Sequence, residues 1–168
     1  MINTTTLSTV RPVALPPGGG ERIWITGDTV QIKATAPETR GAFTMLEVIA
    51  MPGGGPPPHT HEREDEAFYV LDGEFELLVG DQIVRGEPGT YVFVPSGTVH
   101  RFGCVGDRPG RILIVFTPGG IEGFFREAGT QATDDGPPPP LDAEEIARTE
   151  VAAPRYGLRV VEWAGSSA

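Results

Sequence analysis

The chain has 168 residues, the length of a single domain, and 39% of them are apolar, which is enough to bury a core. Its 23 glycines and 17 prolines suit short strands joined by turns and exclude a helical bundle. The formal net charge of −10 argues against a nucleic-acid partner and against an anionic membrane, and the single cysteine, Cys104, excludes an internal disulfide and a cysteine-rich zinc site.

Residues 1–20 are predicted to form an N-terminal arm that ends in prolines and glycines. Residues 21–118 contain short β-branched and aromatic segments that recur about every ten residues with turn residues between them, which is typical of an antiparallel sandwich or barrel. The expected strands are 22–26, 29–35, 42–51, 67–71, 75–79, 82–85, 90–94, 99–105 and 111–117.

Residues 119–168 are predicted to form a C-terminal helical extension and tail. Helical spacing of apolar residues predicts a helix over 121–128, and a second short helix is expected over 141–148, capped by Asp142. Residues 158–163 are expected to be a final strand or an ordered tail. The chain shows no secretory-signal pattern and no apolar run long enough for a membrane span, which predicts a cytoplasmic location without a membrane partner.

All three histidines belong to one spacing pattern. His59 and His61 are two residues apart, so in a strand they lie on the same face. Glu66 opens the next predicted strand, and His100 follows the turn at residues 95–97. If these strands line one barrel, three imidazoles and a carboxylate converge, which is a donor set that holds a divalent transition metal.

The spacing alone does not settle which carboxylate would complete that donor set. Glu64 lies on the same strand face as Glu66, and Glu62 and Asp65 are close by in the chain. An acidic run of this kind is usually a solvated loop, and we expect that of Glu62, Glu64 and Asp65.

Two longer patterns carry a family resemblance. Gly53-x5-His59-x-His61-x4-Glu66-x6-Gly73 resembles the first cupin motif, and Gly89-x5-Pro95-x-Gly97-x2-His100 resembles the second. The resemblance implies an all-β fold, a single antiparallel jelly-roll β-barrel with short C-terminal helices. It also implies a set of four metal ligands, of which Glu66 would be the catalytic base. These ligands are His59, His61, Glu66 and His100.

One position departs from the second motif, because Cys104 stands where cupins often have asparagine. Cys104 shares strand parity with His100 and Phe102, so we expect all three side chains to face the interior. A buried cysteine is more often a small apolar filler than a nucleophile.

The segment 120–127, which contains Gly-x-x-Gly-Phe-Phe, is similar to the single-barrel quercetin 2,3-dioxygenase-like cupins. That likeness implies one divalent metal ion, with nickel, cobalt, manganese or iron favoured and zinc as a further candidate. It implies a dioxygenase that uses dioxygen and a flavonol-like or other enolisable phenolic substrate. Two alternatives remain open: a non-redox metal cyclase or isomerase, and a non-enzymatic barrel that binds a small molecule.

A homodimer is expected by similarity to other cupins. The apolar side chains of Ile23, Trp24 and Ile25 are predicted to lie outside the barrel, where a second copy could cover them.

Overall fold

A computed structural model describes residues 10–161 of the chain. Most strands fall within one or two residues of their predicted ranges. The strands are β1 (Glu21–Ile25), β2 (Asp28–Ala34), β3 (Thr44–Ala50), β4 (His59–His61), β5 (Asp65–Asp72), β6 (Phe75–Val79), β7 (Gln82–Gly86), β8 (Tyr91–Val94), β9 (His100–Cys104), β10 (Gly110–Thr117), β11 (Thr130–Gln131) and β12 (Leu158–Val160). The helices are α1 (Ala36–Thr39), α2 (Glu122–Ala128), α3 (Ala143–Ala152) and the 3₁₀ helix η1 (Ala153–Tyr156).

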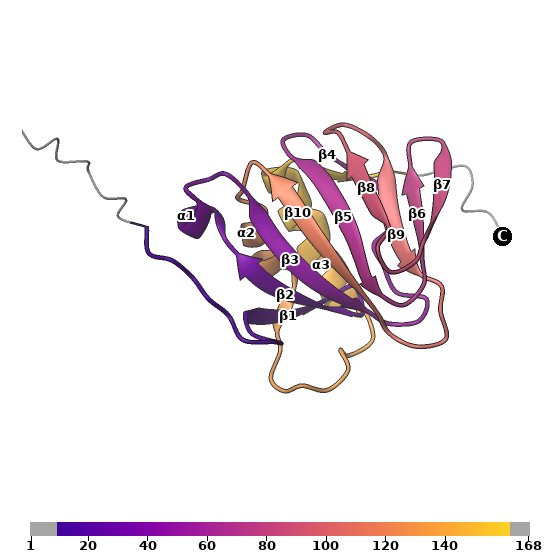
Figure 1. Cartoon of the computed structure of the whole chain (residues 1–168), viewed down its shortest axis with the longest axis horizontal. Helices are drawn as coiled ribbons and strands as arrows, with labels where there is room; N and C mark the ends of the chain where they lie inside the picture. The colour runs from indigo at the N-terminus through magenta and orange to yellow at the C-terminus, as the bar shows by residue number, and fades with distance from the viewer. Residues whose placement is uncertain (1–9, 162–168) are drawn as a thin grey trace, which may run out of the picture.

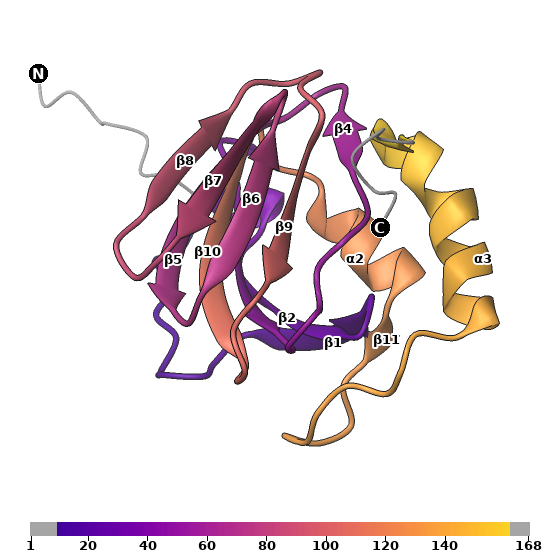
Figure 2. The same cartoon turned by 90° about the vertical axis from the view of Figure 1, so that its right-hand side faces the viewer.

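These strands form two antiparallel sheets that face each other (Figures 1 and 2). The larger sheet has the order β11-β1-β2-β3-β10-β5-β8, and the smaller has the order β12-β4-β9-β6-β7. The predicted all-β jelly-roll fold is confirmed, although the two sheets are not joined into one closed hydrogen-bonded barrel.

Alternation of side chains along the strands places the core between the sheets. In β3 every second residue is buried, from Thr44 through Leu46 and Val48 to Ala50, while the residues between them are partly exposed. β10 pairs with β3 and repeats the pattern with Ile112, Ile114 and Phe116. The smaller sheet contributes Phe75, Leu77, Phe102 and Cys104 from its own inner face. The prediction that Cys104 fills the interior is therefore confirmed.

A glycine- and proline-rich segment, residues 52–58, leads from the larger sheet into β4. Gly54 lies so close to Asp28 that a Cβ atom there would overlap the Asp28 carboxylate. Gly55 has a φ of +126°, and a Cβ atom on it would overlap the carbonyl group of Phe102. Glycine at both positions lets this segment pass close to Asp28 and Phe102 and lead into β4 in the smaller sheet.

The C-terminal elements cover one side of the sandwich, where α2 and α3 pack against each other beside β4 (Figure 2). Both predicted helices are present, and the Asp142 side chain caps α3 by accepting a hydrogen bond from the amide of Glu145. The predicted final strand is present as β12, which pairs with β4 at the edge of the smaller sheet. The part of that prediction that reaches residue 163 lies outside the described residues.

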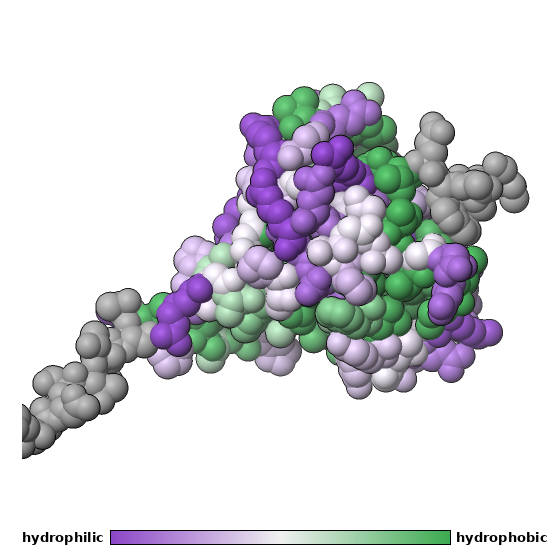
Figure 3. Space-filling model, turned by 90° about the horizontal axis from the view of Figure 1, so that it is seen from above, coloured by the Kyte–Doolittle hydropathy of each residue, from purple (hydrophilic) through white to green (hydrophobic). Residues whose placement is uncertain are grey.

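One prediction about the surface is wrong. Ile23 and Ile25 do not lie outside but are buried, at 2% and 4% exposure, because α2 contacts β1 and β11 pairs with its edge, and Trp24 is half-buried. The exposed aromatic residues are instead on the outer face of β5 and β8, at Tyr69, Tyr91 and Phe93. Seen from above, hydrophilic and hydrophobic residues are interspersed: a hydrophilic group lies in the upper middle of the view, and hydrophobic residues gather mainly to its right and at the lower left (Figure 3). Within residues 10–161 no helix has the length and apolar character that crossing a membrane requires.

Candidate metal centre

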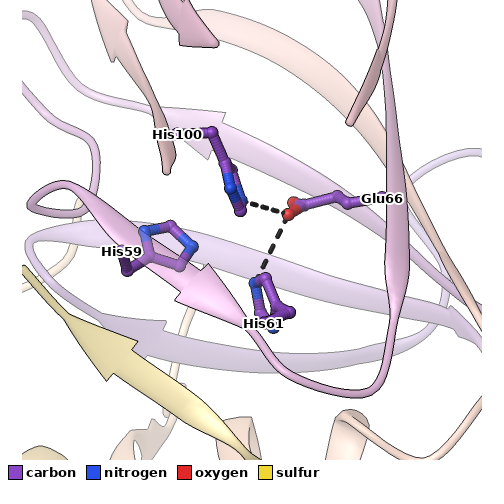
Figure 4. Close-up of side chains that lie close together, drawn as sticks. All are labelled: His59, His61, Glu66 and His100. Atoms are coloured by element: carbon purple, nitrogen blue, oxygen red, sulfur yellow. Dashed lines mark hydrogen bonds and ion pairs between the residues drawn. The ribbon is translucent and has the colours of Figure 1, made fainter. Parts of the chain in front are cut away.

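The two sheets bring together the four side chains that the motifs single out. His59 and His61 come from β4, His100 comes from the neighbouring β9, and Glu66 approaches from β5 of the opposite sheet. His59 and His100 are direct partners in the β4–β9 ladder. All four residues are buried, and one donor atom from each lies within 4.8 Å of the others (Figure 4).

The Glu66 carboxylate contacts two of the three histidines. Its Oε2 atom lies 2.6 Å from Nε2 of His100 and 3.3 Å from Nε2 of His61. Burial alone would raise the pKa of Glu66, but the hydrogen bonds from His100 and His61 outweigh it and hold that pKa well below its ordinary value. Glu66 is therefore an ionised carboxylate at neutral pH.

Burial and neighbouring side chains shift the pKa values of two of the imidazoles. Burial would lower the pKa of His100, but the hydrogen bond to Glu66 outweighs this and raises it. Burial, together with the neighbouring His100 and His61, lowers the pKa of His59 to about 3, so His59 is neutral at physiological pH. A neutral imidazole has the free lone pair that metal ligation requires.

Hydrogen bonds on the outer ring nitrogens orient two of the histidines. Nδ1 of His59 donates to the carbonyl group of Pro57 at 2.9 Å, and Nδ1 of His100 donates to the carbonyl group of Thr98 at 2.8 Å. These bonds direct Nε2 of each ring toward the centre. Histidines that bind metals usually donate the other ring N–H to a carbonyl or carboxylate group in this way.

Glu64 faces the outer nitrogen of the third histidine. Nδ1 of His61 and Oε2 of Glu64 are 3.8 Å apart, and neither atom has a hydrogen-bond partner among residues 10–161. The prediction that Glu64 is solvated is wrong: it is only 5% exposed, because the turn between β4 and β5 folds its side chain inward. Glu62 is exposed, as expected, and pairs with Arg159. Asp65 is half-buried, begins β5 and accepts a hydrogen bond from the amide of Ser96, so the prediction of a solvated loop is wrong there as well.

This donor set fits a divalent transition metal. Imidazole nitrogen and carboxylate oxygen both bind such ions at about 2.0–2.2 Å, so two donors on one ion are at most about 4.4 Å apart. The observed spread of 4.8 Å closes to that value with small side-chain shifts. Three imidazole nitrogens and one carboxylate oxygen would leave coordination positions for substrate oxygens on a five- or six-coordinate ion.

The cluster opens into a cavity of about 90 Å³ whose wall is mostly apolar. The aromatic residues Phe102 and Phe116 line it from the sheets, and Phe124 and Phe125 line it from α2. Thr149 of α3 and the β12 residues Leu158 and Val160 complete the side formed by the C-terminal elements. For comparison, an apolar cavity of roughly 150 Å³ holds one benzene ring.

Asp28 also lines this cavity, and sequence reasoning did not single it out. It opens β2 directly after the tight turn at residues 26–27, where an aspartate reads as an ordinary turn residue. It is nevertheless 1% exposed, and burial raises its pKa to about 7, although the backbone amides of Met51 and Gly55 offset part of that effect. No local pattern indicates this burial, because the covering segment is more than twenty residues away.

The fold and the site together define a jelly-roll protein with a buried three-histidine, one-glutamate cluster that could hold a single metal ion. Comparison with known proteins shows which families and structures it resembles. Residues 46–116 match the Cupin domain family. The chain is 32% identical over 119 residues to quercetin 2,3-dioxygenase from Bacillus subtilis, covering 70% of this chain and 35% of that protein. It is 33% identical over 107 residues to quercetin 2,3-dioxygenase from Aspergillus japonicus, covering 60% of this chain and 30% of that protein.

Solved structures show the same fold. KdgF from Halomonas sp. aligns with a TM-score of 0.58 at 22% identity, covering 66% of this chain and 98% of that one. The polyketide cyclase RemF from Streptomyces resistomycificus aligns with a TM-score of 0.57 at 21% identity, covering 76% and 90%. The chain thus has the cupin fold, matches the Cupin domain family over residues 46–116 and is similar in sequence to quercetinases, of whose length it spans about a third.

Proposed function

We propose that this protein is a metal-dependent dioxygenase that acts on a small enolisable phenolic compound. The observation that carries the proposal is the buried cluster of His59, His61, Glu66 and His100, which opens into an apolar, aromatic-walled cavity. The similarity to two quercetin 2,3-dioxygenases supports the choice of reaction class.

In this proposal the four clustered residues are the metal ligands, and nickel, cobalt, manganese or iron is the favoured ion. A bound ion of this kind would polarise substrate oxygens and exchange electrons with dioxygen. Zinc would supply only the first of these effects.

Glu66 is the proposed catalytic base. It is ionised, its Oε2 atom faces the centre of the cluster, and it is the only carboxylate among the four. A hydroxyl proton of a bound enol or phenol would move to Oε2 of Glu66, which leaves the substrate electron-rich and ready to react with dioxygen. The aromatic wall would hold the ring and keep bulk water from the reacting carbons.

The size of the cavity bears on the substrate. At about 90 Å³ it is smaller than one benzene-sized cavity of roughly 150 Å³, so a single-ring compound needs less rearrangement than a three-ring flavonol. We therefore favour the smaller enolisable phenolics over flavonols.

A non-redox cyclase or isomerase is the second candidate. The same donor set suits zinc, and the fold is shared with a protein named as a polyketide cyclase. A barrel that binds a small molecule without turnover is the third.

Metal analysis and oxygen uptake separate these candidates. Protein purified without added metal would be analysed for bound elements and then assayed on an oxygen electrode with catechol, a one-ring hydroxypyranone and quercetin. We expect a redox-capable ion and oxygen uptake that is lost in Glu66→Gln and kept in Glu62→Gln, a matched change at the surface. Zinc with no oxygen uptake would favour the cyclase or isomerase, and the absence of any retained metal would favour the binding protein.

A further inference from the structure

Asp28 is a buried carboxyl group in the cavity wall that the proposed reaction does not use. It lies on β2, apart from the four clustered residues, and is 1% exposed. Its Oδ1 atom accepts a hydrogen bond from the amide of Met51 at 2.9 Å. Its Oδ2 atom is buried as well and has no hydrogen-bond partner anywhere in residues 10–161.

A structural role accounts for only half of this carboxyl group. Oδ1 holds the start of the segment that leads into β4, since it binds the Met51 amide and abuts Gly54. The amide of Gly55 also acts on the carboxyl group, but Oδ2 forms no hydrogen bond of normal geometry with any of residues 10–161. Leaving a polar atom buried without a partner costs free energy, so an unpaired carboxyl oxygen in a folded protein requires an explanation.

The surroundings of Asp28 supply one. The cavity wall around it is made mostly of aliphatic and aromatic side chains, such as Val30, Val48 and Ile114. Cavities that bind small molecules combine an apolar wall with a few polar groups that fix the orientation of the ligand. Apart from the metal cluster, Asp28 is the one carboxyl group in the described lining of this cavity.

We propose that Asp28 is a substrate-contacting specificity residue, whose free Oδ2 atom accepts a hydrogen bond from a hydroxyl group of the ligand held at the metal cluster. The ligand class is then a small polyhydroxylated ring or enol that has a further hydroxyl group beyond the oxygens that reach the cluster. The inference rests on the proposed function for the kind of ligand, but binding through Asp28 requires no oxidation. Burial raises the pKa of Asp28 to about 7, so its ionised form, which is the stronger acceptor, is present at neutral and higher pH.

Ligands that differ by one hydroxyl group test this contact. The affinities of catechol, 1,2,3-benzenetriol and 1,2,4-benzenetriol would be measured by calorimetry under argon at pH 8, on the protein as purified. We expect at least one triol to bind about 10-fold or more tightly than catechol, which is the size of one hydrogen bond to a charged group.

Two variants and a control connect that preference to Asp28. Asp28→Asn retains an oxygen for the Met51 amide but replaces the free acceptor with a donor, so the fold should persist while the triol preference disappears. Asp28→Ala should remove the preference as well. Asp72→Asn makes the same chemical change at an exposed ion pair with Arg108 and should retain the full preference.

The result that overturns the inference is a triol preference that survives in both Asp28 variants. Equal affinity for catechol and both triols in the unaltered protein, or no binding of any of the three, overturns it too. Failure of the proposed function gives a different result, namely an Asp28-dependent triol preference without oxygen uptake on the electrode.

Discussion

Replacing Asp28 by asparagine should change how the stability of the protein depends on pH. Burial raises the pKa of Asp28 from 3.8 to about 7, and the unfolded chain restores the ordinary value. A carboxyl group with a raised pKa in the folded state stabilises the fold fully below pH 3.8, and this contribution is lost as the pH rises through about 7. Asparagine does not ionise, so the variant should lack this loss.

The magnitude follows from the pKa shift. A shift of about 3 units corresponds to about 4 kcal/mol over the whole pH range, of which about 2.5 kcal/mol falls between pH 5 and pH 8. The difference in unfolding free energy between Asp28→Asn and the unaltered protein should therefore move by about 2.5 kcal/mol in favour of the variant over that interval.

Urea denaturation at a series of pH values, on protein treated with a chelator, measures this difference directly. Both proteins contain the same histidines and Glu66, so the contributions of these groups cancel in the comparison. Asp72→Asn is the control, because the pKa of Asp72 is held at about 2 by its hydrogen bonds with Arg108 and the group stays ionised throughout the interval. Unfolding free energies of Asp28→Asn and unaltered protein that run parallel from pH 5 to pH 8 would refute the reasoning.

Three further predictions concern the site and its cover. Glu66→Gln should abolish metal retention in elemental analysis, whereas Glu64→Gln should weaken metal affinity about 10- to 100-fold by removing the carboxylate beside His61; equal loss in both would contradict the assignment of Glu66 as the ligand. Phe125→Ala should enlarge the cavity and shift relative oxygen uptake from catechol toward quercetin, and an unchanged ratio would mean that Phe125 does not limit size. Gly55→Ala should destabilise the protein by about 1–3 kcal/mol or more in urea denaturation, because its backbone conformation and its contact with the carbonyl group of Phe102 exclude a side chain. Wild-type stability in that variant would contradict the fold around β4.

Much of the fold could be predicted because strand periodicity is a local signal. The alternation in β3 and β10 and the turns between strands are visible over a few residues, and the histidine spacing identified the residues that converge at the centre. The choice of Glu66 came from the family motif, since strand parity alone left Glu64 as an alternative.

The error at β1 and the missed role of Asp28 share one physical cause, which is burial by segments distant in the sequence, whereas the error at Glu64 is local. Nothing in the sequence near Ile23 and Ile25 indicates that α2 and β11, about a hundred residues later, contact β1 and cover it. Glu64 was judged by the acidic composition around it, although its strand parity with Glu66 already indicated an inward side chain. Asp28 gives no local signal at all, since the partner of its carboxylate is Met51 on another strand connection.

The pairing of β12 with β4 links the end of the described chain to the histidines. Leu158 lies opposite His61 and Val160 lies opposite His59 in this ladder. The backbone of the two histidines is therefore held on one side by a strand nearly a hundred residues later in the sequence. Detachment of that strand would leave β4 as a sheet edge with fewer restraints on its imidazoles. An ion held by the histidine cluster would therefore be bound more tightly when β12 is attached to β4, and metal affinity would report on that attachment.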